Sequence, residues 1–306
     1  MNPAIFSDNH RSLKEGGAGS LPQWFRQELP GDKALSLARE LKESGIHTVC
    51  QEAKCPNVSG CFNKNNLTFI ILGNVCSRNC RFCAVQKAQV TKKLIIDAQE
   101  SERIAEVVKK LGMTYVVITS VTRDDLVDGG AEIFARTIKS VRAIDNSIRL
   151  EVLIPDLKGS IDSLKIIIDA GPNVVAHNIE TVAGLYPEVR PMADYRLSLG
   201  VIENIKRLNP DIISKSSIML GLGETRKEVI EAMRDLRQAH CDILVLGQYL
   251  APSINHYPVK RFVSPTEFDS YKEIATEIGF KAVFSAPLAR SSFRAGEIFE
   301  GELIHV

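Results

Sequence analysis

The sequence predicts an α/β fold, a partial (β/α)6 barrel of the TIM type with extensions at both ends that cover the barrel mouth. Two observations predict it. Six short apolar segments rich in β-branched residues alternate with amphipathic helical segments along the chain. The apolar segments are also nearly continuous, as strands covered on both faces should be. Such units in series imply a parallel sheet with right-handed crossovers.

We expect six barrel strands, each followed by a crossover or a rim loop. The expected strands are residues 67–72, 115–120, 149–154, 174–178, 216–220 and 243–249. The expected helices are residues 98–111, 131–143, 161–170, 195–208 and 226–239. Gly112 and Gly171 follow the last apolar turns of two of these helices, where glycine often ends a helix.

The chain divides into three predicted parts. Residues 1–63 form an N-terminal extension with one amphipathic helix, 33–44, residues 64–265 form the barrel, and residues 266–306 form a C-terminal extension. Within the last part we expect a helix at 266–278, a short strand at 281–284 and a polar turn at 290–293.

Bulk composition excludes some classes of protein. The 306 residues are 44% hydrophobic and 25% charged, which suits a folded chain with a sizeable core. A formal net charge of +1 gives no general attraction to nucleic acid or membrane, and we expect neither as a partner. No run of 18 apolar residues occurs. Residues 1–19 are polar and lack the apolar centre of a secretory signal, so we expect a loose arm and a cytoplasmic protein.

Six of the seven cysteines crowd into one 34-residue window. They are Cys50, Cys55, Cys61, Cys76, Cys80 and Cys83. In a reducing compartment such crowding indicates metal or cluster binding rather than disulfides. Cys241 stands alone between a predicted helix and a predicted strand, and we expect it to be a buried structural thiol.

The six cysteines form two triplets, with spacings C-x4-C-x5-C and C-x3-C-x2-C. Each triplet is one ligand short of a closed tetrahedral zinc site. A cubane iron–sulfur cluster takes one protein ligand per iron, so three thiolates leave one iron open to a small molecule. The alternative is a pair of structural zinc sites completed by His47 or His177.

The second triplet, with Phe82 just before its last cysteine, resembles the signature of the radical S-adenosylmethionine superfamily. The resemblance implies that Cys76, Cys80 and Cys83 hold a [4Fe–4S] cluster. In that superfamily the open iron binds the methionine end of S-adenosylmethionine, and one electron from the cluster releases a 5′-deoxyadenosyl radical. The implied fold is the partial barrel of the radical S-adenosylmethionine kind.

Polar residues at the carboxyl ends of the predicted strands are candidates for binding that nucleoside, because barrels place their chemistry on these loops. The candidates are Thr119, Asp124, Asn178, Glu180, Gly221 and Gly223. Asn178 and Glu180 suit the ribose or methionine end, and the glycines would let the backbone approach adenine. For each of them the alternative is an ordinary turn or helix-cap role.

From about Pro22 to the C-terminus the chain resembles the lipoyl synthase family. Both triplets match in order and spacing, and C-x4-C-x5-C is the most diagnostic feature, since biotin synthase does not carry it. Further matching runs are Glu52-Ala53-Lys54-Cys55-Pro56-Asn57, Arg123-Asp124-Asp125-Leu126, Asn178-Ile179-Glu180-Thr181, Gly221-Leu222-Gly223-Glu224-Thr225 and Gly247-Gln248-Tyr249-Leu250.

The resemblance implies a second site and a reaction. Cys50, Cys55 and Cys61 would hold an auxiliary [4Fe–4S] cluster, completed by Ser292, which matches the second serine of the family's Arg-Ser-Ser-Tyr motif. The implied reaction inserts sulfur at C6 and C8 of an octanoyl chain linked to a lysine of a carrier domain. Two molecules of S-adenosylmethionine would be used, and the auxiliary cluster would be sacrificed.

The implied partners are an octanoylated carrier of the glycine cleavage H protein or 2-oxoacid dehydrogenase E2 type, and an electron donor such as flavodoxin or ferredoxin. An iron–sulfur carrier would repair the cluster. Two alternatives remain open: a related sulfur-inserting enzyme, such as biotin synthase or a methylthiotransferase, and a non-enzymatic iron–sulfur or zinc protein.

The chain departs from the family pattern at four positions, none of them a predicted cluster ligand. Phe293 replaces the tyrosine of the serine motif and removes a hydroxyl. Thr122, Ala176 and Met192 replace an acid, a polar residue and a glycine beside other motifs. These departures concern the predicted nucleoside contacts more than the cysteine chemistry.

Overall fold

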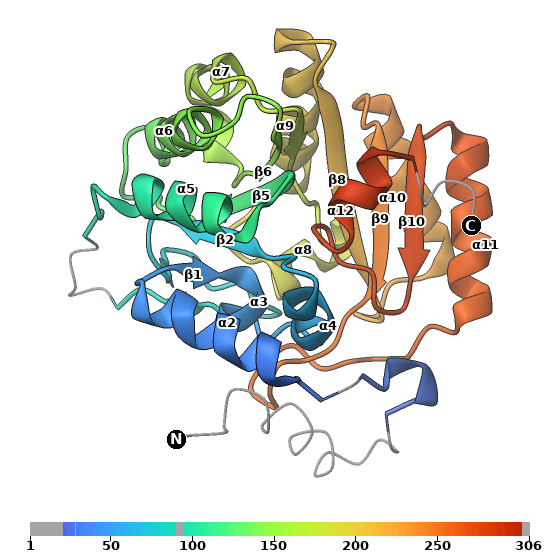
Figure 1. Cartoon of the computed structure of the whole chain (residues 1–306). Helices are drawn as coiled ribbons and strands as arrows, with labels where there is room; N and C mark the ends of the chain where they lie inside the picture. The colour runs from blue at the N-terminus through green and yellow to red at the C-terminus, as the bar shows by residue number, and fades with distance from the viewer. Residues whose placement is uncertain (1–20, 28, 90–94, 302–306) are drawn as a thin grey trace.

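The computed structural model describes residues 21–27, 29–89 and 95–301. The predicted N-terminal arm, residues 1–19, lies outside this part of the chain. The main sheet has eight strands in the order β1-β2-β5-β6-β7-β8-β9-β10, and it curls into a barrel whose open side faces the viewer in Figure 1. The predicted partial barrel is confirmed.

Strand neighbours pair in parallel from β2 onward, and only β1 runs antiparallel, against β2. The strands are β1 (His47–Thr48), β2 (Thr68–Ile71), β5 (Tyr115–Ser120), β6 (Arg149–Leu153), β7 (Val174–Ala176), β8 (Ile213–Leu220), β9 (Ile243–Gln248) and β10 (Ala282–Ala286). All six predicted barrel strands are present. The strand expected in the C-terminal extension is β10, which joins the same sheet beside β9.

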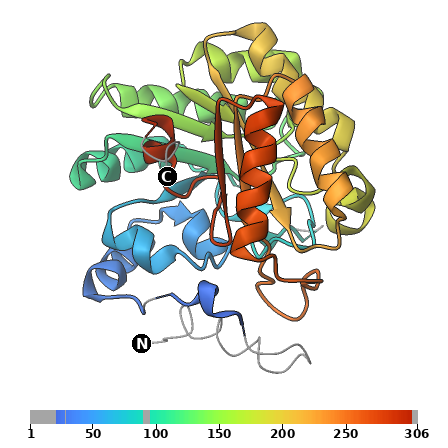
Figure 2. The same ribbon diagram turned by 90° about the vertical axis from the view of Figure 1, so that its right-hand side faces the viewer.

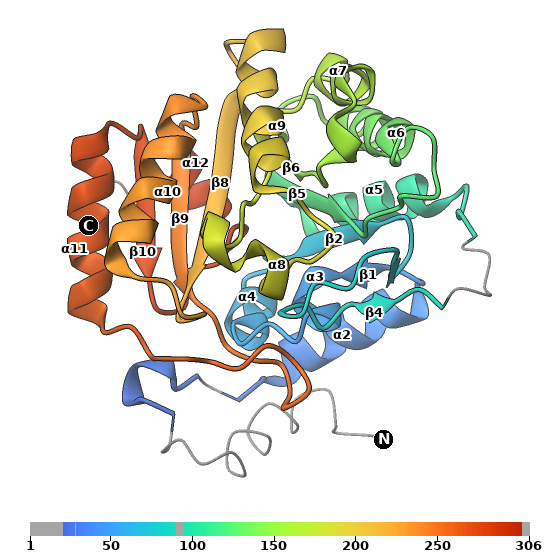
Figure 3. The same cartoon turned by 180° about the vertical axis from the view of Figure 1, so that it is seen from behind.

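Six long helices cover the outer face of the barrel, each packed against the next (Figures 1 and 3). They are α5 (Glu100–Leu111), α6 (Ala131–Arg142), α7 (Ile161–Asp169), α9 (Tyr195–Leu208), α10 (Arg226–Gln238) and α11 (Pro265–Ile278). Side-chain caps fix several starts. At α10, Thr225 and Glu228 form a complete capping box, which satisfies two backbone N–H groups that the first turn leaves unpaired.

Smaller elements surround the barrel mouth and its open side. They are η1 (Gln23–Phe25), α2 (Asp32–Glu43), α3 (Val49–Glu52), α4 (Val58–Asn63), β3 (Val75–Cys76), β4 (Gln86–Lys87), η2 (Leu157–Gly159), η3 (Ala183–Leu185), α8 (Tyr186–Val189) and α12 (Ala295–Phe299). Of these, only α2 was predicted, as the amphipathic helix of the N-terminal extension. The others are too short to show a hydrophobic period.

The C-terminal segment occupies the open side of the barrel. Helix α12 contacts β5, where the rings of Phe299 and Tyr115 lie 5.7 Å apart. Figure 2 shows α12 on this open side, away from α11, which lies on the outer face. Within the described residues, no helix has both the length and the apolar character to cross a membrane.

Candidate functional site

A cavity of about 660 Å³ opens at the carboxyl ends of the barrel strands, and both cysteine triplets line it. One triplet belongs to the N-terminal extension and the other to the first barrel loop, yet both face one space. Ser292, Thr119, Asn178 and Glu180 also line this cavity. Both triplets therefore face the same cavity as these four residues.

The C-x3-C-x2-C triplet begins with Cys76, the last residue of β3, and continues on the loop to β4, which pairs with β3 in parallel. This loop is anchored from its own interior by Arg78, which is 8% exposed. The Arg78 guanidinium donates to Asp124 at 2.8 and 2.9 Å, and to Asp156 at 2.8 Å with a second, shorter bond. The Ser77 backbone N–H also donates to the Thr122 carbonyl at 2.9 Å. Two barrel loops thus hold the triplet in place.

Charge pairing stabilises this anchor. The hydrogen bonds and charge of Arg78 hold the pKa of Asp124 below its usual range. Burial acts to raise the pKa of Asp156, but the bonds and charge of Arg78 outweigh it and the net shift is downward. Both carboxylates are therefore ionised at neutral pH, and the bidentate geometry is specific to an arginine.

The C-x4-C-x5-C triplet lies on two short helices and the turn between them, which holds Cys55, over the barrel mouth. Cys50 is in α3, whose first turn is capped by Thr48, and Cys61 is in α4. Burial raises the pKa of Cys50 and of Cys55, and it raises that of Cys61 to about 12. Thiols in such a setting ionise only when a positive charge binds them, as a metal does.

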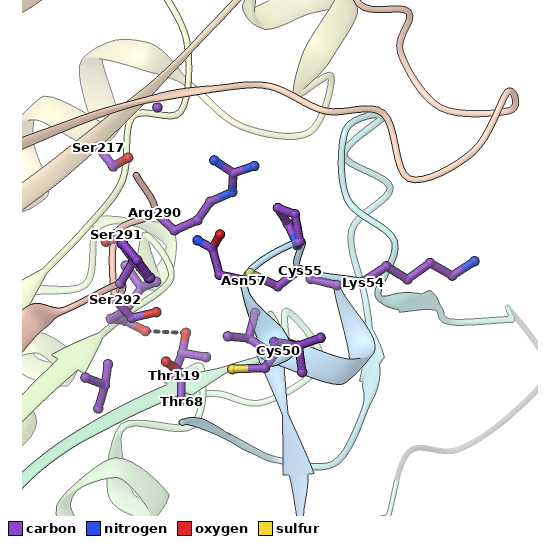
Figure 4. Close-up of a pocket in the computed structure, with 18 of the residues that line it drawn as sticks. Cys50, Lys54, Cys55, Asn57, Thr68, Thr119, Ser217, Arg290, Ser291 and Ser292 are labelled. Carbon is purple, nitrogen blue, oxygen red and sulfur yellow. Dashed lines mark hydrogen bonds between the residues drawn. The ribbon is translucent and has the colours of Figure 1, made fainter. Parts of the chain in front are cut away.

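The C-terminal loop brings Arg290, Ser291 and Ser292 to the same space (Figure 4). Arg290 extends toward the cavity between Ser217 and Cys55 in Figure 4. Its burial lowers its pKa, and the charges of Cys55 and Glu180 oppose that shift. The guanidinium therefore places a positive charge beside the auxiliary triplet and beside the rim of β7.

The end of β7 carries the predicted nucleoside contacts. Asn178 Nδ2 donates to Glu180 Oε1 at 3.1 Å, and Glu180 is buried. Burial raises the pKa of Glu180, while the nearby Arg190 charge and the Asn178 bond act against that rise. Arg190 also interacts with Cys80, so this rim touches the C-x3-C-x2-C triplet directly.

Not every predicted residue reaches the cavity. Asp124, Gly221 and Gly223 are absent from its lining, and Asp124 serves the Arg78 anchor instead. At Gly221 the backbone N–H donates to Glu224 at 2.6 Å and the carbonyl accepts from Lys260 N at 2.8 Å. A side chain at Gly221 would collide with Gln248 and the Arg261 carbonyl, so a local packing reason accounts for this glycine. Thr119 lines the cavity, but its hydroxyl donates to Leu153 O at 2.8 Å (Figure 4).

Three arginines were missed by sequence reasoning as parts of the site. Arg78 lies inside the second triplet, Arg190 follows the β7 rim, and Arg290 precedes the two serines. The sequence offered only a weak sign of this role. Each arginine lies inside or next to a predicted ligand motif or strand end, but an arginine at such a position is equally typical of a solvent-exposed turn. Only the folded chain shows that Arg78 and Arg190 are buried and Arg290 is half-buried, beside thiols and carboxylates.

The described residues contain no group of three or more His, Cys, Asp or Glu side chains converging on a single ion. A structural zinc site needs four ligands around one metal, at about 2.0–2.3 Å. A cubane has a different requirement, because each thiolate binds a separate iron. Cubane clusters and zinc sites completed by His47 or His177 therefore differ in how closely their ligands must converge.

Comparison with known proteins identifies the class. Residues 70–236 match the radical SAM superfamily. The structure is similar to that of methylornithine synthase, with a TM-score of 0.55 and 15% identity over 70% of this chain and 62% of that one. It is also similar to a maturase of the [FeFe]-hydrogenase, with a TM-score of 0.54 and 16% identity over 92% of this chain and 66% of that one. These likenesses show the fold, and the site and the match together define a radical S-adenosylmethionine enzyme.

The sequence relatives are more specific. A lipoyl synthase of Caldicellulosiruptor bescii is 50% identical over 90% of this chain and 94% of its own length. A lipoyl synthase of Thermus thermophilus is 46% identical over 91% of this chain and 86% of its own. The chain belongs to the lipoyl synthase family. This membership decides against the related sulfur-inserting enzymes and the non-enzymatic alternatives.

Superfamily membership implies S-adenosylmethionine and a [4Fe–4S] cluster, and the residues fit both. Cys76, Cys80 and Cys83 line the cavity with no fourth cysteine beside them in their motif. Burial raises the pKa of Cys80 and of Cys83, so a bound cation would supply the charge that their thiolate forms need. The adjoining space can hold a ligand of nucleoside size.

Proposed function

We propose that this chain inserts two sulfur atoms, at C6 and C8, into an octanoyl chain carried on a lysine of a lipoyl-carrier domain. The observation that supports it best is the shared cavity: both triplets face one space of about 660 Å³. A substrate methylene in that space can lie near a nucleoside at one triplet and a sulfur source at the other.

The division of labour follows the two triplets. Cys76, Cys80 and Cys83 would hold the cluster that, with S-adenosylmethionine, supplies a 5′-deoxyadenosyl radical. A C–H bond of an unactivated methylene requires such chemistry, which the protein alone cannot provide. Cys50, Cys55, Cys61 and Ser292 would hold the auxiliary cluster that supplies sulfur. A serine oxygen is a harder ligand than thiolate, which suits an iron that must be released.

The chain's own residues bind, orient and exclude water. Asn178 and Glu180 would hold the ribose or methionine end of the nucleoside, with Thr119 beside them. Arg290 places a positive charge beside Cys55, which would stabilise an anionic thiolate-bound group. Roles for Gly221, Gly223 and Asp124 are indirect in this proposal, because they hold the turn and the loop around the site.

Each of the three parts of the chain has its own role in this proposal. The 1–63 extension would present the auxiliary cluster, the 64–265 part would bind the radical cluster, and the 266–306 extension would supply the serine. We propose a cytoplasmic enzyme whose substrate is an octanoylated H protein or E2 domain. A flavodoxin or ferredoxin would reduce it, and an iron–sulfur carrier would rebuild its auxiliary cluster.

Anaerobic reconstitution followed by product mass analysis tests this function. The wild-type chain should contain about eight irons, four for each of two cubanes. It should convert an octanoyl-lysine carrier domain to the lipoyl form. Replacing Cys50, Cys55 and Cys61 with Ala should abolish sulfur insertion and leave reductive cleavage of S-adenosylmethionine intact. The reason is that the two triplets occupy separate loops.

The matched control replaces Cys241, a buried cysteine remote from both triplets in sequence, with Ala. Cys241 is fully buried and its thiol donates to Ile243 O at 3.3 Å, as expected of a structural residue. The control should keep eight irons and both reactions. Loss of nucleoside cleavage in the triple variant, with its fold intact, would contradict the proposed separation of roles.

A further inference from the structure

The loop that carries Ser292 is bonded to β9 by its backbone, where Gln248 N donates to Pro287 O at 3.1 Å, and side-chain bonds attach it on two further sides. On one side, Asn57 Nδ2 in the auxiliary triplet region donates to Leu288 O at 2.7 Å. On the other side, Ser291 Oγ donates to Asn178 Oδ1 at 3.0 Å, at the end of β7. The serine next to the predicted ligand is therefore bonded to the predicted nucleoside rim.

The direction of this second bond is fixed by its neighbour. Asn178 gives its Nδ2 protons toward the Glu180 carboxyl, at 3.1 Å, so its Oδ1 must face Ser291. An amide oxygen only accepts, and the Ser291 hydroxyl must therefore donate. Ser291 is 9% exposed and Asn178 is 8% exposed, so neither group can exchange this bond for water without cost.

The Asn178–Glu180 turn is the rigid partner. Glu180 has a φ of +65°, and its backbone bonds to β8 on both sides, accepting from Met219 N at 2.8 Å and donating to Ser217 O at 3.0 Å. Arg190 Nη1 donates to the Asn178 carbonyl at 3.1 Å from below. The loop is held by fewer bonds, so it is the part that responds when this bond changes.

We propose that Ser291 is a positioning residue that couples nucleoside binding at Asn178 and Glu180 to the position of Ser292 beside the C-x4-C-x5-C triplet. The inference rests on the proposed function, in which Asn178 and Glu180 bind S-adenosylmethionine. A nucleoside that engages this pair fixes the Asn178 amide in the orientation that accepts from Ser291. The loop then stays against the auxiliary triplet, and by linkage the coupling is reciprocal.

The test measures iron release from the reconstituted protein to a ferrous chelator, with and without S-adenosylmethionine and without reductant. The variant lacking Cys50, Cys55 and Cys61 gives the contribution of the radical cluster, which is subtracted. In the wild type, S-adenosylmethionine should slow release of auxiliary iron about three- to tenfold, the effect expected of one hydrogen bond.

Three variants separate coupling from general loosening. Ser291→Ala should lose the nucleoside-dependent protection, and Ser291→Thr should keep it because the hydroxyl remains. The matched control is Ser285→Ala in β10. Ser285 is 8% exposed and its hydroxyl donates to Phe268 O at 2.7 Å, so this control loses a comparable buried bond in β10, between β10 and α11, without touching the Asn178 contact.

Several results would overturn the coupling. They are equal protection in Ser291→Ala and wild type, no protection in wild type, or equal loss in Ser291→Ala and Ser285→Ala. Failure of the proposed function looks different: the wild type would hold a single cluster or insert no sulfur. If the protein holds two clusters and inserts sulfur normally, but the protection of auxiliary iron is the same with and without the Ser291 hydroxyl, the coupling is refuted and the proposed function stands.

Discussion

His177 directly follows β7 and lies next to Asn178 at the predicted nucleoside site. Its Nδ1 lies 2.9 Å from the Ile154 carbonyl, which can only accept, so Nδ1 carries the proton. The other nitrogen, Nε2, has no hydrogen-bond partner among the described residues, and the ring lines the cavity. Burial, with the Arg190 charge adding to it, lowers the pKa of His177 to about 4. The ring is therefore neutral, and the lone pair of Nε2 is buried without a partner among the described residues.

The sign of its pH effect follows from that pKa. In the unfolded chain a histidine titrates near 6.5, so as pH falls below 6.5 the unfolded state takes up a proton and the folded state does not. The free energy of unfolding therefore declines from pH 6.5 down to about 4. Between pH 7.5 and 5.5 this one residue should remove about 1.3 kcal/mol.

We predict that His177→Gln makes the urea midpoint less sensitive to pH over that interval, since Gln does not titrate and can still donate to Ile154. The measurement is the unfolding midpoint of the reconstituted protein at pH 7.5 and 5.5. His240→Asn is the control, because His240 is exposed and Asn tolerates its positive φ of 61°. A pH dependence unchanged in His177→Gln would contradict the neutral buried ring.

At the residue scale, the sequence predicts site residues best where a motif with fixed spacing identifies them. The cysteines and Ser292 were predicted to gather, and all of them line the cavity. It fails for Arg78, Arg190 and Arg290, because a charged residue is usually at the surface and only its burial gives it a role. Ion pairs between distant loops leave no periodic pattern to detect.

At the scale of the elements, β9 and the C-terminal loop approach each other closely. At Gly247 in β9, an added Cβ would lie 2.1 Å from the Ala289 carbonyl oxygen and 2.9 Å from its carbon. Both are backbone atoms, so they cannot rotate away as a side chain would. Only glycine lets the loop that carries Ser291 and Ser292 pass this close to the barrel.

Gly247→Ala should therefore displace the loop and cost about 1–3 kcal/mol of stability, as overpacking does. The expected local sign is faster amide hydrogen exchange across residues 287–293, with little change elsewhere. The matched control is Gly200→Ala in α9, where an added Cβ meets nothing within 4 Å. That control should be neutral or stabilise by about 0.5–1 kcal/mol. Unaltered exchange in the Gly247 variant would show that the loop is not held here.

The element scale also shows where the predicted boundaries fell short. The expected strand 216–220 corresponds to β8, Ile213–Leu220, which begins three residues earlier. Ser214 and Lys215 lie just outside the expected strand, yet they are 0% and 1% exposed inside the sheet. A lysine inside a strand can be recognised only when its counterion is known, and that counterion lies on another strand.

Across the whole molecule, that counterion joins strands that are not neighbours. Lys215 Nζ in β8 bonds both oxygens of Glu151 in β6, at 2.9 and 3.0 Å, and β7 lies between these strands in the sheet. Tyr115 of β5 donates to the same carboxylate at 2.7 Å. A polar network inside the barrel thus links β5, β6 and β8, each member satisfied by another.

Such a pair should be costly to break and cheap to replace as a whole. Lys215→Met leaves a buried, unpaired Glu151 and should lower the unfolding free energy by about 3–5 kcal/mol. Adding Glu151→Gln removes the stranded charge while still accepting from Tyr115, so the double variant should recover most of that loss. Urea unfolding of the two single variants and the double variant measures the coupling.

The exposed pair Lys227–Glu231 on α10 is the matched control, with side chains 85% and 54% exposed and 3.7 Å apart. Lys227→Met should change the unfolding free energy by less than about 0.5 kcal/mol, because water screens the pair. If the effects of the Lys215 and Glu151 substitutions on the unfolding free energy are purely additive, the two charges do not stabilise each other. The apolar contacts of α12 and of the strands would then be what stabilises this part of the barrel. A large coupling makes the network the tie that holds β5, β6 and β8 around the cavity.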